Sequence, residues 1–120
     1  MRHRNTKATL NRPFDVRRSM VRNLITSLFL YGKVKTTGAR ARVLESEAEK
    51  LVSRVRKQDT FNAIRELQRV LTTENACKNA AEYLKTLKVT SGFTRSTKIT
   101  SRDGDGAMVV QVELIHPEKK

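Results

Sequence analysis

The chain has 120 residues and a formal net charge of +13, from 25 lysines and arginines against 12 acidic residues. This length corresponds to one domain that can bury a core without cross-links. The single cysteine, Cys77, excludes an internal disulfide, and the longest apolar run, LITSLFLY at 24–31, falls far short of the roughly 20 residues of a membrane span. The charge indicates an anionic partner, either a nucleic acid or a membrane surface.

The positive charge is concentrated in the first third of the chain. Residues 1–44 hold 11 Lys or Arg and one acidic residue, whereas 45–90 hold nine against seven and 91–120 hold five against four. Arginine dominates in 1–44, and its planar guanidinium suits bidentate phosphate contacts. Aromatic residues are only 5% of the chain, which disfavours binding by base stacking. The pattern predicts contacts to the backbone of a structured nucleic acid.

Residues 1–13, MRHRNTKATLNRP, have no hydrophobic period and are predicted to form an extended basic arm. The residues alone allow three roles for it: a nucleic-acid-binding extension, a solvated tail, or an arginine-rich targeting presequence. After Met1, Leu10 is its only large apolar residue, so it cannot form the amphipathic helix of a presequence. The first amphipathic helix that follows is needed for the core.

A helix is predicted from Asp15 to a stop at Gly32, followed by a short strand at KVKT, 33–36. The apolar face of this helix consists of Val16, Met20, Leu24 and Leu28, with Val21 and Ile25 beside them. Arg18 and Arg22 fall together on the opposite face because they are four residues apart.

A second helix is predicted from a cap at Thr36 or Thr37 to about residue 57, with a buried stripe at Ala41, Leu44, Ala48, Leu51 and Val55. Arg40 and Arg42 lie in its first turn, where cations oppose the helix dipole by about 0.3–1 kcal/mol. Chance and a bound phosphate explain this equally well. Glu45 and Glu49 on the same helix are expected to face solvent or protein rather than nucleic acid.

Two shorter helices and a hairpin complete the pattern. Asp59 or Thr60 can cap a third helix, and Thr72 or Thr73 a fourth. Their apolar positions are Phe61, Ile64, Leu67 and Leu71 in the third, and Ala76, Cys77, Ala80, Leu84 and Leu87 in the fourth. The segment FTRSTKIT at 93–100, the turn RDGDG at 102–106 and the strict alternation of Met108, Val110, Val112 and Leu114 predict a β-hairpin. The order helix-strand-helix-helix-helix-strand-strand is an α+β fold.

No metal, cofactor or catalytic site is expected. His3, His116 and Cys77 do not have zinc-ligand spacing, and Cys77 falls on an apolar helical face. Asp103 begins a segment similar to a calcium loop, but Ala107 and Leu114 occupy ligand positions, which favours a plain turn. We therefore predict that the protein is not an enzyme and binds no small-molecule substrate.

Short motifs in order along nearly the whole chain give the sequence a family resemblance. They are MRHR at 1–4, LNR at 10–12, RN at 22–23, KTT at 35–37, GFTR at 92–95 and the GD...AM turn at 104–108. In this order and spacing, the sequence resembles the family of bacterial large-subunit ribosomal protein seventeen. It departs from that family at Val16, where the family usually has His, and at Ser91-Gly92-Phe93, where the family has Gly-Gly-Tyr.

The resemblance implies a structural protein of the large ribosomal subunit, bound to 23S-type rRNA near the exit of the polypeptide tunnel. It implies a cytoplasmic protein within the ribosome, with neighbours such as large-subunit proteins twenty-two and thirty-two and without a membrane partner. The family sequence begins at Met1, so no presequence is expected. The implied fold has two layers, with helices packed on a small mixed three-stranded sheet.

On this basis the chain is divided into a basic rRNA-binding arm at 1–13, a globular α+β domain at 14–116 and a short basic tail at 117–120. The predicted rRNA-binding residues are Arg2, His3, Arg4, Lys7, Arg12, Arg17, Arg18, Arg22, Asn23, Lys35, Thr36, Thr37, Arg40, Arg42, Arg95, Lys98 and Arg102.

Three other functions compete with this interpretation. A free DNA-binding protein of nucleoid or helix-turn-helix type is the strongest, because the third and fourth helices are close in sequence. However, the recognition helix would then carry Glu74 and Glu82 and little arginine, which suits a major groove poorly. An RNA-modifying enzyme would need catalytic residues that the pattern lacks, and a membrane-surface helix would need an apolar face that the core already uses.

Overall fold

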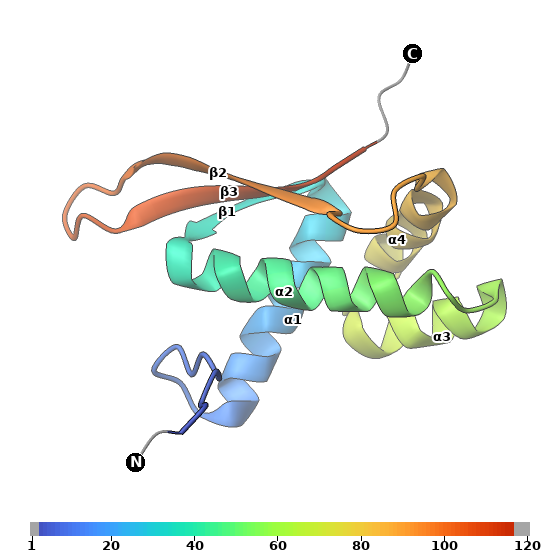
Figure 1. Ribbon diagram of the computed structural model, residues 1–120, viewed down its shortest axis with the longest axis horizontal. Helices are drawn as coiled ribbons and strands as arrows, with labels where there is room; N and C mark the ends of the chain where they lie inside the picture. The colour runs from blue at the N-terminus through green and yellow to red at the C-terminus, as the bar shows by residue number, and fades with distance from the viewer. Residues whose placement is uncertain (1–2, 117–120) are drawn as a thin grey trace.

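A computed structural model describes residues 3–116 and has the predicted element order (Figure 1). The elements are α1 (Phe14–Tyr31), β1 (Lys33–Thr37), α2 (Gly38–Val55), α3 (Thr60–Val70), α4 (Glu74–Thr86), β2 (Thr94–Ser101) and β3 (Met108–Leu114). The predicted α+β class and the order of its elements are therefore confirmed. Arg2 and the tail at 117–120 lie outside the described residues.

The three strands form one sheet in the order β1-β3-β2. Both pairings are antiparallel, so the expectation of a mixed sheet is wrong in this detail. The reason is that β1 and β2 run in the same direction but β3 lies between them, and they never pair. Val34 lies opposite Val112 in the register, and a bulge interrupts β2 between Lys98 and Thr100.

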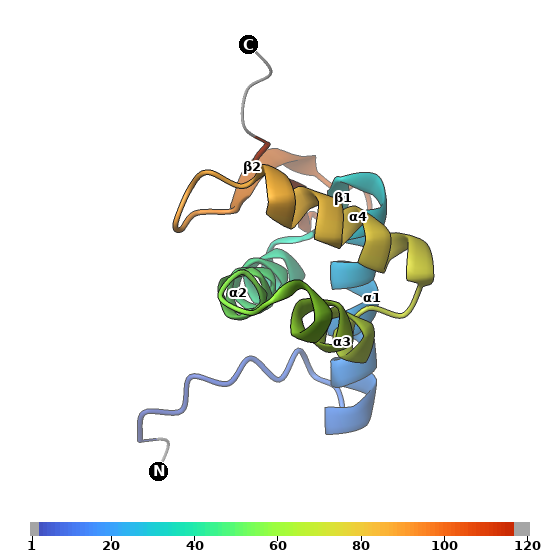
Figure 2. The ribbon, with the colours of Figure 1, turned by 90° about the vertical axis from the view of Figure 1, so that its right-hand side faces the viewer.

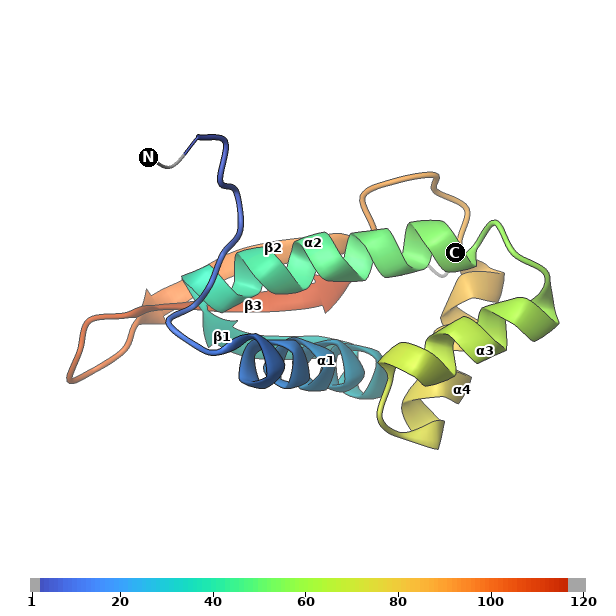
Figure 3. The ribbon, with the colours of Figure 1, turned by 90° about the horizontal axis from the view of Figure 1, so that it is seen from below.

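The predicted two-layer arrangement holds for the first two helices. Viewed from below, α1 and α2 run under the sheet, and α3 and α4 lie beyond its end (Figure 3). The end view shows that α3 and α4 extend the helical layer by packing on α1 and α2 (Figure 2). Val110, Val112 and Leu114 point from β3 into this layer and are buried, whereas β2 is exposed over nearly its whole length. One face of the sheet is therefore open.

The core is built mainly on α2, as its periodicity predicts. Ala41, Leu44, Ala48, Leu51 and Val55 are all buried. Cys77 is buried in the same cluster, which agrees with its predicted role in packing.

The apolar stripe predicted for α1 is only partly correct. Val16 is 47% exposed and Met20 is half-buried, whereas Ile25, Leu28 and Phe29 are buried. The N-terminal half of α1 projects beyond the other helices (Figure 1), which leaves Val16 exposed.

The predicted helix boundaries follow from local chemistry. Gly32 ends α1 in the left-handed conformation (φ 79°), and its N–H donates to the Leu28 carbonyl at 2.8 Å. Thr73 precedes α4, and its Oγ1 accepts a hydrogen bond from the Ala76 N–H at 3.3 Å. Both are positions at which the sequence favours a helix end.

Two polar contacts fix the hairpin to the helices. Glu49 Oε1 accepts hydrogen bonds from the Phe93 N–H at 2.6 Å and from the Thr94 N–H at 3.0 Å and Oγ1 at 3.1 Å. The Tyr83 hydroxyl of α4 donates to the Ile115 carbonyl at 2.8 Å, at the end of β3. Burial, helped by the nearby Glu49 carboxylate, raises the pKa of Tyr83 to about 12, so this hydroxyl stays protonated at neutral pH.

Candidate nucleic-acid interface

One group of cationic side chains lines a depression between the arm, α1, α2 and the end of α3, which we call the arm groove. Its volume is about 740 Å³. Its lining includes one carboxylate, Glu47, and the cationic residues Lys7, Arg17, Arg18, Arg22, Arg42, Lys50 and Arg69. Five of these seven cations, namely Lys7, Arg17, Arg18, Arg22 and Arg42, are predicted rRNA-binding residues. Segments far apart in the sequence thus build one concave positive surface.

The arm forms one wall of this groove. It runs from α1 along the lower side of α2 (Figure 2), so that Thr6, Lys7 and Ala8 lie near the α2 residues of the lining. A turn before α1 aims it there: Leu10 and Asn11 both have φ 53°, and the Arg12 N–H donates to the Thr9 carbonyl at 3.1 Å. The described arm residues His3, Arg4, Lys7 and Arg12 are all exposed.

Ion pairing divides the cations of the groove into two groups. Lys50 pairs with Glu47 at 2.9 Å, and Arg69 lies 3.6 Å from Glu66. Within residues 3–116, Lys7, Arg17, Arg18 and Arg42 have no carboxylate within ion-pair distance. Unpaired guanidinium groups in a concave surface are suited to phosphate.

Arg22 has a role that its position in the sequence does not reveal. Its Nε donates to the Val70 carbonyl at 3.0 Å and its Nη2 to the Arg69 carbonyl at 2.9 Å. These carbonyls belong to the last residues of α3, where helix carbonyls lack intrahelical partners and a positive charge is favoured. Arg22 therefore caps α3 from α1, and only its remaining N–H groups can reach a ligand.

A second positive surface lies on the open side of the sheet, and we call it the sheet surface. Because side chains alternate along strands, the register places Lys35, Gln111 and Thr97 in one row and Lys33, Glu113 and Arg95 in the next. Arg95 Nη1 lies 3.8 Å from Glu113 Oε1. Lys33 was not among the predicted residues, although its spacing of two from Lys35 on a strand would have indicated it.

The other predicted sheet residues are placed differently. Thr36 and Lys98 both lie opposite Val110 and so belong to the inner side of the sheet, although Lys98 is exposed. Thr37 lies opposite Val109, on the open side. Arg102 is in the hairpin turn, where its guanidinium pairs with Asp105 and holds the pKa of that carboxyl down to about 2. Arg102 therefore already has a carboxylate partner within the turn.

Three of the predicted rRNA-binding residues, Lys35, Arg40 and Arg42, are close in sequence at the start of α2 but do not form a single group. Arg42 lines the arm groove and Lys35 lies on the sheet surface. Arg40 is two residues from Arg42, which turns it to another side of the helix by about 200°. The structure thus divides these cations between surfaces.

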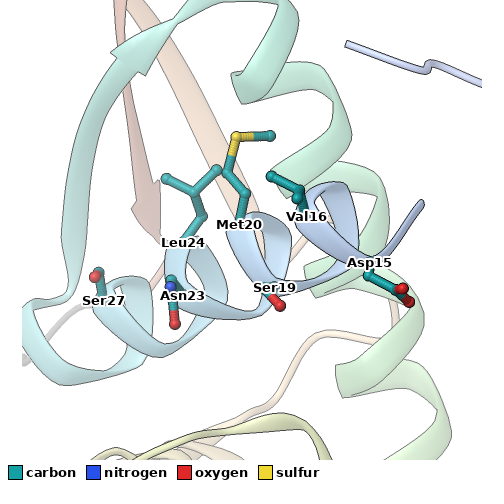
Figure 4. Close-up of a pocket in the computed structure, with 7 residues that line it drawn as sticks. All are labelled: Asp15, Val16, Ser19, Met20, Asn23, Leu24 and Ser27. Carbon is teal, nitrogen blue, oxygen red and sulfur yellow. The ribbon is translucent and has the colours of Figure 1, made fainter. Parts of the chain in front are cut away.

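Asn23 lies on yet another side of α1. Figure 4 shows this side as a shallow groove along a single helix, lined by Asp15, Val16, Ser19, Met20, Asn23, Leu24 and Ser27. It faces away from the arm groove, because Arg18 and Ile25 lie on the opposite side of α1. Asn23 is therefore separated from the predicted cationic residues that line the arm groove.

The described part of the chain shows little sign of other chemistry. Among residues 3–116, no three His, Cys, Asp or Glu side chains gather as a metal site. None of the helices described is long and apolar enough to cross a membrane. The arm and the hairpin tip lie toward one end of the molecule, and α3 and α4 lie at the other (Figure 1). This arrangement defines a class: small α+β proteins with cationic surfaces that are built from an arm, a helix pair and a sheet.

The comparisons with known proteins identify the family. A family model described as "Ribosomal protein L17" matches residues 20–115. The chain is 39% identical over 108 residues to large ribosomal subunit protein bL17 of Clostridium perfringens, covering 88% of this chain and 95% of the relative. It is 38% identical over 121 residues to the protein of that name from Chloroflexus aggregans, covering 96% of this chain and 100% of the relative.

The chain therefore belongs to the ribosomal protein L17 family, as the motifs of its sequence predict. Members of this family are structural proteins and not enzymes, and in bacteria they are located in the ribosomes of the cytoplasm. The prediction that the chain is not an enzyme is confirmed by this membership. Family membership also displaces the free DNA-binding protein as an interpretation.

Proposed function

We propose that this protein is a structural constituent of the large ribosomal subunit that binds 23S-type rRNA through the phosphate backbone, near the exit of the polypeptide tunnel. The names of its relatives support the assignment to the large subunit. The observation that carries the mode of binding is the arm groove, in which Lys7, Arg17, Arg18 and Arg42 converge from three segments and have no carboxylate partner among residues 3–116. Its proposed protein partners are ribosomal proteins near the tunnel exit, such as large-subunit proteins twenty-two and thirty-two.

The two cationic surfaces have different parts in this proposal. The arm groove is concave and arginine-rich, and can follow one strand of a folded RNA through bidentate phosphate contacts. The sheet surface offers lysine, threonine and glutamine side chains in a nearly flat array, which suits phosphate and 2′-hydroxyl groups of an A-form helix. Together they allow the protein to bridge two RNA segments, and the arm at 1–13 adds further phosphate contacts.

The salt dependence of binding tests the arm groove. If Arg18 and Arg42 each neutralise a phosphate, replacing either with alanine lowers the slope of log affinity against log salt by about 0.7–0.9. Affinity for matched and scrambled duplexes falls alike, because backbone contacts carry little sequence information. The measurement is filter binding of a 23S rRNA fragment over a series of salt concentrations.

The matched control is Lys57→Ala, which removes the same charge from the connection between α2 and α3, away from both surfaces. We expect it to leave the slope unchanged. Equal slopes for Arg18→Ala, Arg42→Ala and Lys57→Ala would show that RNA does not occupy the arm groove.

Placement within the subunit needs a separate measurement. Co-sedimentation with intact large subunits through a sucrose gradient at moderate salt tests incorporation. Hydroxyl-radical cleavage from an iron chelate on a cysteine introduced at exposed Ser46, in a Cys77→Ser background, then maps nearby rRNA. Cleavage confined to rRNA far from the tunnel exit would contradict the proposed location while leaving rRNA binding intact.

A further inference from the structure

A groove between α3 and α4 belongs to neither cationic surface. Its volume is about 240 Å³. Its lining is mainly apolar and consists of Val55, Arg56, Gln58, Thr60, Ala63, Ile64, Leu67, Ala81, Leu84, Lys85 and Leu87. We call it the α3–α4 groove, and nothing in the proposed binding of rRNA uses it.

The apolar stripe of α3 is longer than the core that it covers. Phe61, Ile64, Leu67 and Leu71 follow one another at helical spacing, yet only the last two are buried. Phe61 is 68% exposed, and Ile64, which lines the groove, is 39% exposed. Single exposed apolar residues need no explanation, but a stripe that continues from the core into an apolar groove is typical of a binding surface.

The charged side chains that line this groove are cationic, and the neighbouring carboxylate of Asp59 accepts a hydrogen bond from Asn62 at 2.6 Å. Arg56 and Lys85 are the charged residues of its lining, and the lining contains no carboxylate. The Arg65 guanidinium lies 5.6 Å from the centroid of the Phe61 ring and adds positive charge beside the exposed aromatic surface. An apolar floor with a cationic rim complements a ligand that combines apolar side chains with acidic ones.

This chemistry selects one occupant. The mainly apolar floor offers few donors to an RNA phosphate. A second copy of a chain with net charge +13 would be repelled. The groove lies between two helices at the end of the molecule away from the arm and the hairpin tip (Figure 1). We propose that the α3–α4 groove is a docking site for an acidic amphipathic helix of another protein, bound with its apolar side chains against Ile64, Leu84 and Leu87.

The test uses the full chain and a synthetic fluorescent peptide, without RNA. The peptide has leucines at i, i+3, i+4 and i+7 and glutamates beside them. The control is a scrambled peptide of the same composition. At about 0.15 M salt, where long-range attraction is screened, we expect the amphipathic peptide to bind about tenfold more tightly than the scrambled one. The measurement is fluorescence anisotropy.

Variants locate the binding to the groove. We expect Ile64→Ser and Lys85→Glu each to weaken binding of the acidic peptide about tenfold. A second peptide, with lysines in place of the glutamates, should bind the Lys85→Glu variant more tightly than it binds the original chain. Both residues are exposed, so the variants should fold, which a thermal melt checks. Arg42→Glu, which reverses a charge in the arm groove, is the matched control for Lys85→Glu and should leave peptide binding unchanged.

Three outcomes would overturn the docking site. Equal binding of the scrambled peptide, or equal weakening by Arg42→Glu and Lys85→Glu, would show a general attraction to positive charge. Displacement of the bound peptide by a 23S rRNA duplex would assign the groove to RNA. The salt slopes of rRNA binding are measured separately, so either proposal can fail without the other.

Discussion

At the scale of single residues, the arginines of this protein divide between folding and binding. Arg22 caps the C-terminal end of α3, and Arg102 pairs with Asp105 inside the hairpin turn. Arg18 and Arg42 line the arm groove and form no ion pair with a carboxylate among residues 3–116. All four carry the same formal charge, but Arg22 and Arg102 already use part of their N–H groups in hydrogen bonds within the fold.

The first prediction concerns Arg22. Replacing it with alanine removes two charge-assisted hydrogen bonds and leaves the Arg69 and Val70 carbonyls short of donors. We expect the free energy of unfolding to fall by about 1–3 kcal/mol, as measured by urea denaturation. Arg18→Ala, four residues earlier on the same helix and exposed, should change it by less than about 0.5 kcal/mol.

Binding data complete this comparison. Arg22→Ala should lower the salt slope of rRNA binding less than Arg18→Ala does. If Arg22→Ala instead left stability unchanged and lowered the slope by a full contact, the capping role of Arg22 would be refuted.

At the scale of elements, α2 is the centre of the molecule. Its buried stripe supports the sheet on one side and α1 and α3 on the others, and its Glu49 fixes the start of β2. The bond to the Phe93 N–H holds the backbone of a phenylalanine that is fully buried. Glu49 thus joins the hairpin, which is last in the sequence, to the helical layer that precedes it in the chain.

The second prediction concerns this connection. Glu49→Ala leaves three donors of Phe93 and Thr94 without their acceptor. We expect a loss of about 2–4 kcal/mol in the free energy of unfolding, and a smaller loss of about 1 kcal/mol for Glu49→Gln, whose amide oxygen still accepts. Thermal or urea denaturation measures both.

Glu45→Gln is the matched control, because the side chain of Glu45 makes no hydrogen bond within the described residues. It should leave stability nearly unchanged. Equal losses for Glu45→Gln and Glu49→Gln would show that the contacts to β2 add nothing to stability. The two glutamates, which the sequence places in one class, are thus expected to differ.

At the scale of the whole molecule, the arm and the α3–α4 groove lie at opposite ends. The cationic arm lies toward one end, whereas the other end carries the α3–α4 groove and carboxylates that pair with cations, such as Glu66 with Arg54 at 2.8 Å and Glu74 with Lys78 at 2.9 Å (Figure 1). A molecule polarised in this way can enter a folded RNA from one end and present the other to protein.

The third prediction tests the arm. Deleting residues 2–12 removes four cations but, among the described residues, little buried apolar surface, since Leu10 is half-buried and its neighbours are exposed. We expect the free energy of unfolding to change by less than about 1 kcal/mol, while incorporation into large subunits, measured by co-sedimentation, falls severely. A large drop in melting temperature would show that the arm belongs to the core.

The sequence by itself determined the elements, their order, the buried stripe of α2 and the family. These depend on local information: hydrophobic period, capping residues, turn glycines and the spacing of short motifs. Helix ends at Gly32 and Thr73 were predictable because one residue's conformation or hydroxyl decides them.

Only the tertiary structure decided which side chains share a surface. Lys50 and Arg69 join the arm groove, Arg22 turns to the end of α3, and Val16 and Phe61 stay exposed on stripes that continue past the core. The antiparallel sheet likewise follows from β3 lying between β1 and β2. Periodicity fixes the side of a helix on which a residue lies, but only the packing of distant segments fixes what that side meets.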